Sequence, residues 1–137
     1  LPATALYPIS VGGYRTETET ASPFSGRGGQ DCWGRVMLDI MAPAEAVRSA
    51  KAGGGYDVFT GTSMAAPFVS GSAALMMEWG IVQGNDLFLY GQRVKAFLCK
   101  GALRSPFLNY PNPQWGYGRL NLCGTMNELV NHMERGL

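Results

Sequence analysis

Apolar side chains recur every three or four residues from about Thr62 to Trp79, which is the strongest hydrophobic pattern in the chain. No charged residue interrupts this stretch before Glu78. We therefore expect a long helix that is buried nearly all round. Gly80 is expected to end it.

Shorter patterns predict the elements around this helix. Runs of apolar residues bounded by glycine, proline or polar residues indicate strands at Ile9 to Tyr14, Val36 to Met41 and Tyr56 to Thr60. Further helices are predicted from Leu89 to Cys99, ended by Gly101, and from Thr125 to Glu134. The first of these is expected to turn its polar residues outward, namely Gln92, Arg93, Lys95 and Lys100. Short buried strands that alternate with helices predict an α/β architecture, with no second domain in residues 1–137.

Composition suggests that much of the surface is meant to be covered. Of the 137 residues, 46% are hydrophobic and only 15% are charged, which is poor in charge for a free-standing domain. The net charge of +1 provides no strong field for nucleic acid, so no nucleic-acid partner is expected. The longest uncharged apolar stretch, Ala65 to Met77, is shorter than the about 20 residues of a membrane span, so no membrane partner is expected.

The cysteines indicate neither a disulfide framework nor a metal site. Cys32, Cys99 and Cys123 are odd in number and form no CxxC pair. We interpret them as buried or partly buried thiols, which favours a reducing or intracellular compartment. Metal-ligand spacing is absent, and no cofactor is identified.

The segment with the clearest chemistry is Gly61-Thr62-Ser63-Met64-Ala65-Ala66-Pro67, named here the serine turn. Gly61 allows a tight turn, and Thr62 or its neighbour can cap the helix. Ser63 would lie where free N–H groups and the helix dipole stabilise an oxyanion. Pro67 lacks an N–H and leaves a carbonyl near Ser63 without its helical partner. The pattern alone leaves two interpretations open, a helix-capping serine or a nucleophile.

A nucleophilic serine needs a base, and the chain contains one histidine, His132. His132 falls in the predicted terminal helix near the polar residues Asn131 and Glu134, which indicates an exposed face. Asp57, although close to Ser63 in sequence, is interpreted as a turn or surface carboxylate. The residues therefore suggest that the chain carries one part of an active site.

Five segments resemble, in the same order, segments of the subtilisin-like serine proteases (subtilases). The serine turn is similar to the nucleophile segment of that family, and the other four are Ile9–Gly12, Phe24–Gly28, Asp39–Pro43 and Gly116–Asn121. Two positions depart from the family pattern: Ala44 stands where glycine is expected, and Phe68 where a histidine is usual. The Phe68 position is one of packing and not of the catalytic triad. A narrower resemblance, to clostridial and other anaerobe members, rests on Met77–Ile81 and Tyr110–Pro113.

The resemblance implies roles for several residues. Ser63 would be the nucleophile and a backbone oxyanion donor, supported by Gly61, Thr62, Met64 and Pro67. Pro2 and Ala3 would form a wall of the substrate pocket. Subtilases carry the triad in the order Asp, His, Ser, so the Asp, the His and the oxyanion Asn would all lie upstream of Leu1.

The resemblance also implies a fold and a function. The chain would be the C-terminal portion, about half, of a doubly wound parallel-sheet catalytic domain. The parent protein would be a serine endopeptidase that acts through an acyl-enzyme on Ser63, and the isolated chain would be inactive. The alternative is an inert pseudoprotease that acts as a binding or regulatory module.

Partners and location follow from the same resemblance. The expected partners are a peptide or protein substrate and the missing N-terminal part, and a half-sheet would self-associate through its exposed edge. Structural calcium is known in the family but cannot be located in these residues. Family habit favours secretion, whereas the unpaired cysteines favour an intracellular or spore-associated location.

Overall fold

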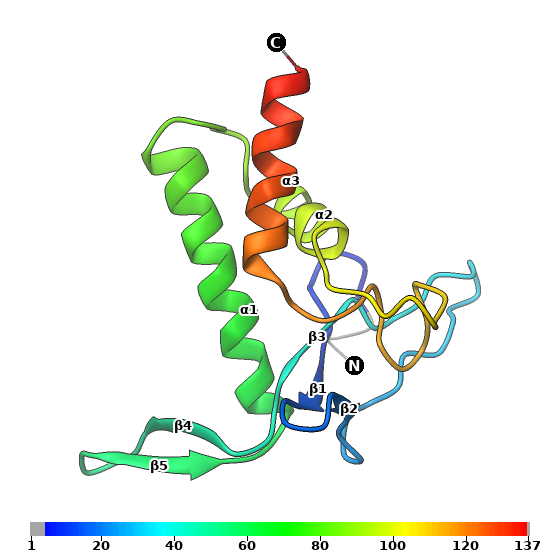
Figure 1. Ribbon diagram of the computed structural model, residues 1–137, viewed down its shortest axis with the longest axis vertical. Coiled ribbons are helices and arrows are strands. Elements are labelled where there is room, and N and C mark those ends of the chain that lie inside the picture. Colours follow the sequence, from blue (N-terminus) through cyan, green and yellow to red (C-terminus); the bar gives the residue numbers. More distant parts are fainter. Residues whose placement is uncertain (1–4, 137) are drawn as a thin grey trace.

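The computed structural model describes residues 5–136 and shows an α/β arrangement in which a small sheet lies beside three α-helices (Figure 1). The strands are β1 Val11–Arg15, β2 Thr20–Ala21, β3 Ile40–Pro43, β4 Val47–Ala50 and β5 Tyr56–Phe59. The helices are α1 Thr62–Met77, the π-helix η2 Glu78–Val82, α2 Gln92–Lys100 and α3 Leu122–Arg135. The predicted Pro2 and Ala3 lie outside the described residues.

A parallel strand pair forms the centre of the sheet. β1 and β3 run parallel with Val11 opposite Ile40, and β2 pairs antiparallel with the other edge of β1. The predicted strand at 36–41 is only partly right, because pairing begins at Ile40 while Val36 and Leu38 are buried without joining the ladder. A short apolar run indicates that its residues are buried, but buried residues need not pair with a neighbouring strand.

The strand predicted before the serine turn belongs to a hairpin that the sequence analysis missed. β4 and β5 form a separate antiparallel pair, joined through Gly53, Gly54 and Gly55, all with positive φ. The pair projects from the rest of the chain at the start of α1 (Figure 1). Tyr56 and Val58 are exposed, so the prediction of a buried strand here is wrong.

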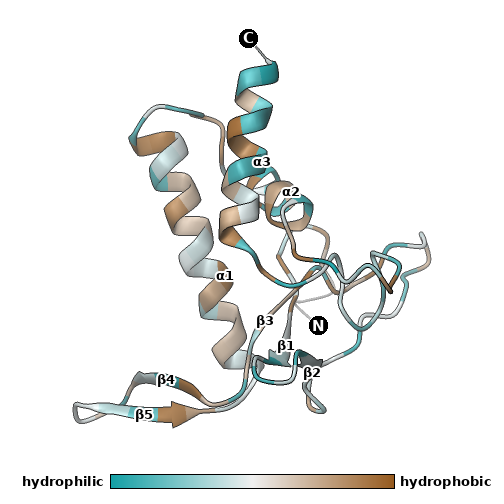
Figure 2. Cartoon of the chain, in the orientation of Figure 1, coloured by the Kyte–Doolittle hydropathy of each residue, from teal (hydrophilic) through white to brown (hydrophobic). Residues whose placement is uncertain are grey.

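The long helix α1 is buried on one side only. It contacts β1 and β3, and its buried residues are Ala65, Val69, Ser72 and Met76. Leu75 is 54% exposed and Phe68 41%, so the expectation of burial all round does not hold for the described chain. Figure 2 shows α1 pale to brown over its length, whereas α3 alternates between teal and brown. One face of α1 is therefore apolar and exposed to solvent in this chain.

The helical stretch also continues past its predicted end. Gly80 lies inside η2, where an added Cβ would come within 2.9 Å of the Asp86 carbonyl oxygen and of Leu89, so this glycine serves close packing. Thr62–Val82 is 21 residues long with a mean hydropathy of 1.2, enough to cross a membrane by length and composition, and 28% of its apolar window is buried within the chain. The apolar helix is thus longer than the sequence analysis predicted.

Two further helices complete the core. α2 ends at Gly101, as predicted, and an added Cβ on Gly101 would collide with the backbone of Thr125 in α3. Asn121 is the N-cap residue of α3, and its side-chain oxygen accepts a hydrogen bond from the Gly124 N–H at 3.1 Å. Ile40, Leu98 and Leu129 belong to one buried cluster that joins the sheet to the three helices.

Candidate active site

The serine turn begins with a backbone shape that suits glycine. Gly61 precedes α1 with φ 153° and ψ 160°, a region that is almost exclusive to glycine. Its N–H donates to the Ala44 carbonyl at 2.8 Å, and its carbonyl accepts from the Met64 N–H at 2.9 Å. Gly61, the neighbour of Thr62, is the N-cap residue, so the helix start has no side-chain cap and Thr62 itself does not cap it.

Ser63 is exposed as the second residue of α1. Within residues 5–136, neither its hydroxyl nor the backbone N–H groups of Thr62 and Ser63 have a hydrogen-bond partner. These N–H groups lie at the positive end of a helix of 16 residues, with no acidic residue in its first turn. The arrangement leaves donors free for an anion that forms beside the Ser63 hydroxyl.

Small residues let this helix end approach the carboxyl ends of the parallel strands. At Gly13 in β1, an added Cβ would lie 2.4 Å from the Ala44 Cβ and 3.6 Å from the Thr62 Cγ2. Ala65, in the first turn of α1, is fully buried. In α/β sheets, ligands bind outside the carboxyl ends of the strands, and Ser63 is held at such an edge.

Pro67 lies inside α1, one turn after Ser63. A residue at this position would normally donate its N–H to the Ser63 carbonyl, and proline cannot. Met64, between them in the turn, is partly buried. Within residues 5–136, the serine turn therefore has free N–H groups beside one exposed hydroxyl, and Pro67 offers no N–H to the Ser63 carbonyl.

Within residues 5–136, no histidine lies beside Ser63. His132 is exposed in the last turn of α3, with its ring 5.4 Å from that of Phe97 in an edge-on contact. That turn lies at the top of Figure 1, and α1 begins at the bottom. Asp57 is an exposed residue of β5 whose carboxylate accepts from the Val58 N–H at 2.8 Å, which agrees with a surface role.

Metal ligands do not cluster in the part of the chain that the structure describes. No group of three or more His, Cys, Asp or Glu residues there could hold a metal ion. Cys32 and Cys123 are exposed free thiols, and Cys99 is a buried one. The interpretation of all three as buried or partly buried thiols is therefore right only for Cys99.

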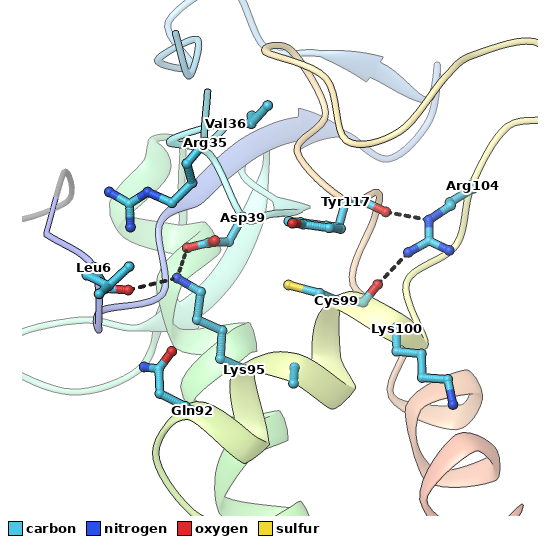
Figure 3. A pocket seen from close by; sticks show the side chains of 11 residues that line it. Leu6, Arg35, Val36, Asp39, Gln92, Lys95, Cys99, Lys100, Arg104 and Tyr117 are labelled. Carbon is cyan, nitrogen blue, oxygen red and sulfur yellow. Dashed lines mark hydrogen bonds and ion pairs between the residues drawn. The ribbon is translucent and has the colours of Figure 1, made fainter. Parts of the chain in front are cut away.

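A second constellation, missed by the sequence analysis, lies beside α2. Asp39 and Lys95 form an ion pair at 2.8 Å on the wall of an open cavity of about 410 Å³ (Figure 3). The Lys95 side chain is only 15% exposed, so the expectation that it faces outward is wrong. Burial raises the pKa of the Cys99 thiol, which also lines this cavity, to about 12. The periodicity of α2 could not reveal this site, because the partner of Lys95 lies far away in the sequence.

Known proteins are similar to this chain in sequence. A model of the Subtilase family matches residues 1–118. Subtilisin E of Bacillus subtilis (strain 168) is 41% identical over 88 residues, which are 60% of this chain and 21% of that protein. Alkaline serine exoprotease A of Vibrio alginolyticus is 39% identical over 77 residues, which are 56% of this chain and 13% of that protein.

Solved structures agree with this assignment. The Clostridium perfringens CspB protease matches with a TM-score of 0.92 and 47% identity, over 96% of this chain and 28% of that one. The patellamide maturation protease PatA matches with a TM-score of 0.77 and 29% identity, over 96% of this chain and 46% of that one. The clostridial match confirms the narrower resemblance, and the chain spans less than half of each of these relatives. On these matches and the geometry of the serine turn, the chain belongs to the subtilase family and has its α/β fold.

Proposed function

We propose that the full-length protein containing this chain is a serine endopeptidase that uses Ser63 as its nucleophile. The observation that carries the proposal is the exposed Ser63 hydroxyl, which lies beside free N–H groups at the positive end of α1. Membership of the subtilase family supports the reaction class. Peptides and proteins are the substrates that this class implies.

The chain's own residues would serve the acyl-transfer steps as follows. The Ser63 hydroxyl oxygen attacks the peptide carbonyl carbon, and a histidine supplied from upstream takes the hydroxyl proton. The carbonyl oxygen becomes negative and is stabilised by the Ser63 N–H and the helix dipole, together with an upstream asparagine. The histidine then passes its proton to the leaving amine, and water hydrolyses the acyl-enzyme.

The chain would be the C-terminal part of a divided catalytic domain. It spans 28% of the CspB protease, and its one histidine lies in the last turn of α3, whereas Ser63 lies in the first turn of α1. We expect the upstream part to provide the base, the orienting carboxylate and the pocket residues that adjoin Pro2 and Ala3. The same part, rather than lipid, would cover the apolar face of α1, which includes Leu75.

Alone, the chain is expected to be inactive and to associate with itself. Exposed Phe68 and Leu75 on α1 and the open strand edges provide the contact surface. Sedimentation velocity at rising concentration checks this, because association increases the weight-average sedimentation coefficient. A concentration-independent monomer with cooperative melting would contradict it.

The remaining proposals concern calcium and location. A structural calcium ion, if the protein carries one, would need ligands from outside the described residues or from backbone carbonyls, since acidic side chains do not cluster there. The likeness to subtilisins supports secretion. The free thiols Cys32, Cys99 and Cys123 support a reducing, intracellular or spore-associated location instead.

Hydrolysis of an unstructured protein substrate tests the proposed function. The full-length protein should release new peptide N-termini, identified by mass spectrometry, and the isolated chain should release none. Full-length protein that binds the substrate tightly without cleaving it would overturn the proposal in favour of a pseudoprotease.

A further inference from the structure

The two faces of the β4–β5 hairpin differ in exposure. Val47 pairs with Phe59 in this hairpin, and Arg48 pairs with Val58. Because neighbouring residues of a strand point to opposite faces, these two pairs lie on different faces. Val47 and Phe59 are partly buried, whereas Arg48 and Val58 are exposed, together with Tyr56 on the same face. We call Arg48, Tyr56 and Val58 the outer hairpin face.

The outer hairpin face holds a guanidinium group against an aromatic ring. The Arg48 Cζ lies 4.9 Å from the centre of the Tyr56 ring. Such a cation–π contact restricts the guanidinium group and leaves its N–H donors available. Tyr56 and Val58 are 67% and 60% exposed, so apolar surface adjoins the charge. This face therefore presents a positive charge at a defined position.

The acidic residues of the hairpin region are directed elsewhere. Glu45, two residues before β4, accepts a hydrogen bond from the Arg15 Nε at 2.6 Å within an ion pair. Asp57 neighbours Val58 in β5 and so lies on the other face, where its carboxylate accepts from the Val58 N–H at 2.8 Å. Within residues 5–136, Arg48 forms no ion pair. A carboxylate from another molecule would complement this charge.

The hairpin is joined directly to the serine turn. The Gly61 N–H donates to the carbonyl of Ala44, which precedes β4, at 2.8 Å. The Ala46 N–H donates to the Thr60 Oγ1 at 3.1 Å. The chain before β4 and the chain after β5 are thus bonded to each other just ahead of Ser63. The position of the hairpin is therefore coupled to that of the serine.

A peptide bound at Ser63 comes within reach of the outer hairpin face. Val58, which pairs with Arg48, precedes Ser63 by five residues, so their Cα atoms are at most about 18 Å apart. An extended peptide covers this distance in about five or six residues. The hairpin projects from the end of α1 that carries Ser63 (Figure 1). Peptide residues up to about six positions from the scissile bond can therefore contact Arg48.

We propose that Arg48, held by Tyr56, is a specificity-determining residue that binds an aspartate or glutamate of the substrate near the scissile bond. The proposal rests on the proposed function, because it requires Ser63 to be the nucleophile. The exposed surfaces of Tyr56 and Val58 would contact apolar atoms beside that carboxylate. The outer hairpin face thereby gives the protease a preference for acidic segments of protein substrates.

Charge reversal by Arg48→Glu in the full-length protein tests the proposal, with Lys51→Glu as the matched control. Lys51 is exposed in the same hairpin. Its N–H donates to the Gly55 carbonyl at 3.2 Å, so the strand pairing continues and alternation places Lys51 off the outer hairpin face. We would measure kcat/KM for peptides that differ only in carrying aspartate, asparagine or lysine, placed in turn at about six positions on each side of the scissile bond.

The unsubstituted protein should prefer aspartate over asparagine at one or more positions by about three- to fivefold, as expected of an exposed ion pair. Arg48→Glu should prefer lysine by a similar factor, and Lys51→Glu should keep the preference for aspartate. Sodium chloride at about 0.5 M should reduce the preference below about twofold, because salt screens exposed charges.

Further variants cover the case in which Arg48→Glu does not fold. Arg48→Gln removes the charge and should abolish the preference for aspartate. Tyr56→Leu removes the ring that holds the guanidinium group and should reduce the preference to about twofold or less, whereas Tyr56→Phe should keep it.

Several results would overturn the proposal. These are no preference for aspartate at any position, a preference that survives both Arg48 substitutions, or an equal loss of preference in Lys51→Glu. Failure of the unsubstituted protein to hydrolyse any of the peptides would overturn the proposed function instead. Fluorescence polarisation of the same peptides would then decide the role of Arg48 in binding: equal affinities for aspartate and asparagine peptides exclude it, and a preference for aspartate that Arg48→Glu reverses supports it.

Discussion

The start of α1 and the inner face of α2 are built in opposite ways. At the start of α1, within residues 5–136, the Ser63 hydroxyl and two backbone N–H groups have no partner. On α2, the ammonium group of Lys95 meets three oxygen atoms within 3.5 Å, one of them from Asp39. The first region is exposed and accessible to a reactant. The second is mostly buried, and its ammonium group has an oxygen partner for each of its donors.

This difference distinguishes a region that can react with a substrate from a region that stabilises the fold. A catalytic group must keep its hydrogen-bonding capacity free for the transition state, so an unfinished serine turn is expected where substrate and an upstream base are to meet. A structural polar group is most stable when all its donors and acceptors have partners, because a buried polar atom without a hydrogen-bond partner lowers the stability of the fold. Within residues 5–136, the chain therefore has one polar site with free hydrogen-bonding groups and one whose hydrogen-bonding groups are paired.

The largest effect that tests this comparison is loss of the nucleophile. Ser63→Ala in the full-length protein should lower kcat for peptide hydrolysis by about 10⁴-fold or more, because the attacking hydroxyl is gone. Stability should change by less than about 0.5 kcal/mol, since the side chain is exposed. Steady-state kinetics and denaturant unfolding measure the two quantities.

Ser70→Ala is the matched control for this variant. Ser70 is exposed on the same helix and its hydroxyl donates to the Ala66 carbonyl at 3.3 Å. It should retain peptide hydrolysis within about twofold, as surface substitutions away from a site usually do. Equal losses in both variants would show that Ser63 acts through helix stability and not as a nucleophile.

The alkylation rates of the three cysteines compare the buried Cys99 of α2 with the exposed Cys32 and Cys123. Burial raises the pKa of Cys99 from 9.0 to about 12, so at pH 8 its thiolate fraction is only about 10⁻⁴. Iodoacetamide at pH 8 should modify Cys99 at least about 10³-fold more slowly than Cys32 or Cys123, which are exposed thiols. Peptide mapping by mass spectrometry gives the three rates.

The same shift makes stability depend on pH at the alkaline end. The unfolded Cys99 thiol loses its proton first, so its contribution to stability is complete below about pH 9 and is lost as the pH rises toward 12. All three cysteines should react at comparable rates in guanidinium chloride. Rapid alkylation of Cys99 in the folded protein would mean that this side of α2 is open.

Removal of the buried ammonium group should destabilise the protein strongly. Lys95→Met is expected to lower the free energy of unfolding by about 3 kcal/mol, because Asp39 stays mostly buried without its counter-ion. Lys100→Met should cost less than about 1 kcal/mol, since its ion pair with Glu128 is half exposed. Urea unfolding compares the two variants, and similar costs would remove the distinction between a buried and a surface pair.

The smallest expected effect concerns the turn before the nucleophile. Gly61→Ala forces a side chain into a backbone region that is almost exclusive to glycine, at a cost of about 1–3 kcal/mol. Gly26→Ala is the control, because an added Cβ there meets nothing within 4 Å and φ is not positive. Thermal unfolding measures both, and equal melting temperatures would show that the turn at Gly61 relaxes without strain.

The sequence predicted the start of the long helix at Thr62 well, because local chemistry defines a helix start. Gly61, Ser63 and Pro67 act through backbone geometry and helix termini, which depend on neighbours in sequence. The family resemblance gave the assignment that the comparisons confirm. The bounds of α2 and α3 were also close, since amphipathic spacing reports one-sided packing.

Long-range features escaped the sequence analysis. Lys95 looks like a surface residue in its helix, and only the fold brings Asp39 and the Pro8 carbonyl to it. Of the β4–β5 hairpin, only β5 was predicted. β4 was not, because its exposed residues show no apolar pattern. The absence of charge in α1 was interpreted as burial, whereas this chain leaves one face of the helix exposed.

Fluorophosphonate labelling of Ser63 tests the central claim most directly. The probe is added to the full-length protein, to the isolated chain and to full-length Ser63→Ala, and the labelled peptide is identified by mass spectrometry. The account predicts labelling at Ser63 in the unsubstituted full-length protein only. No labelling of that protein, when it is folded and mature, would contradict a protease, and labelling of Ser63 in the isolated chain would contradict an upstream base.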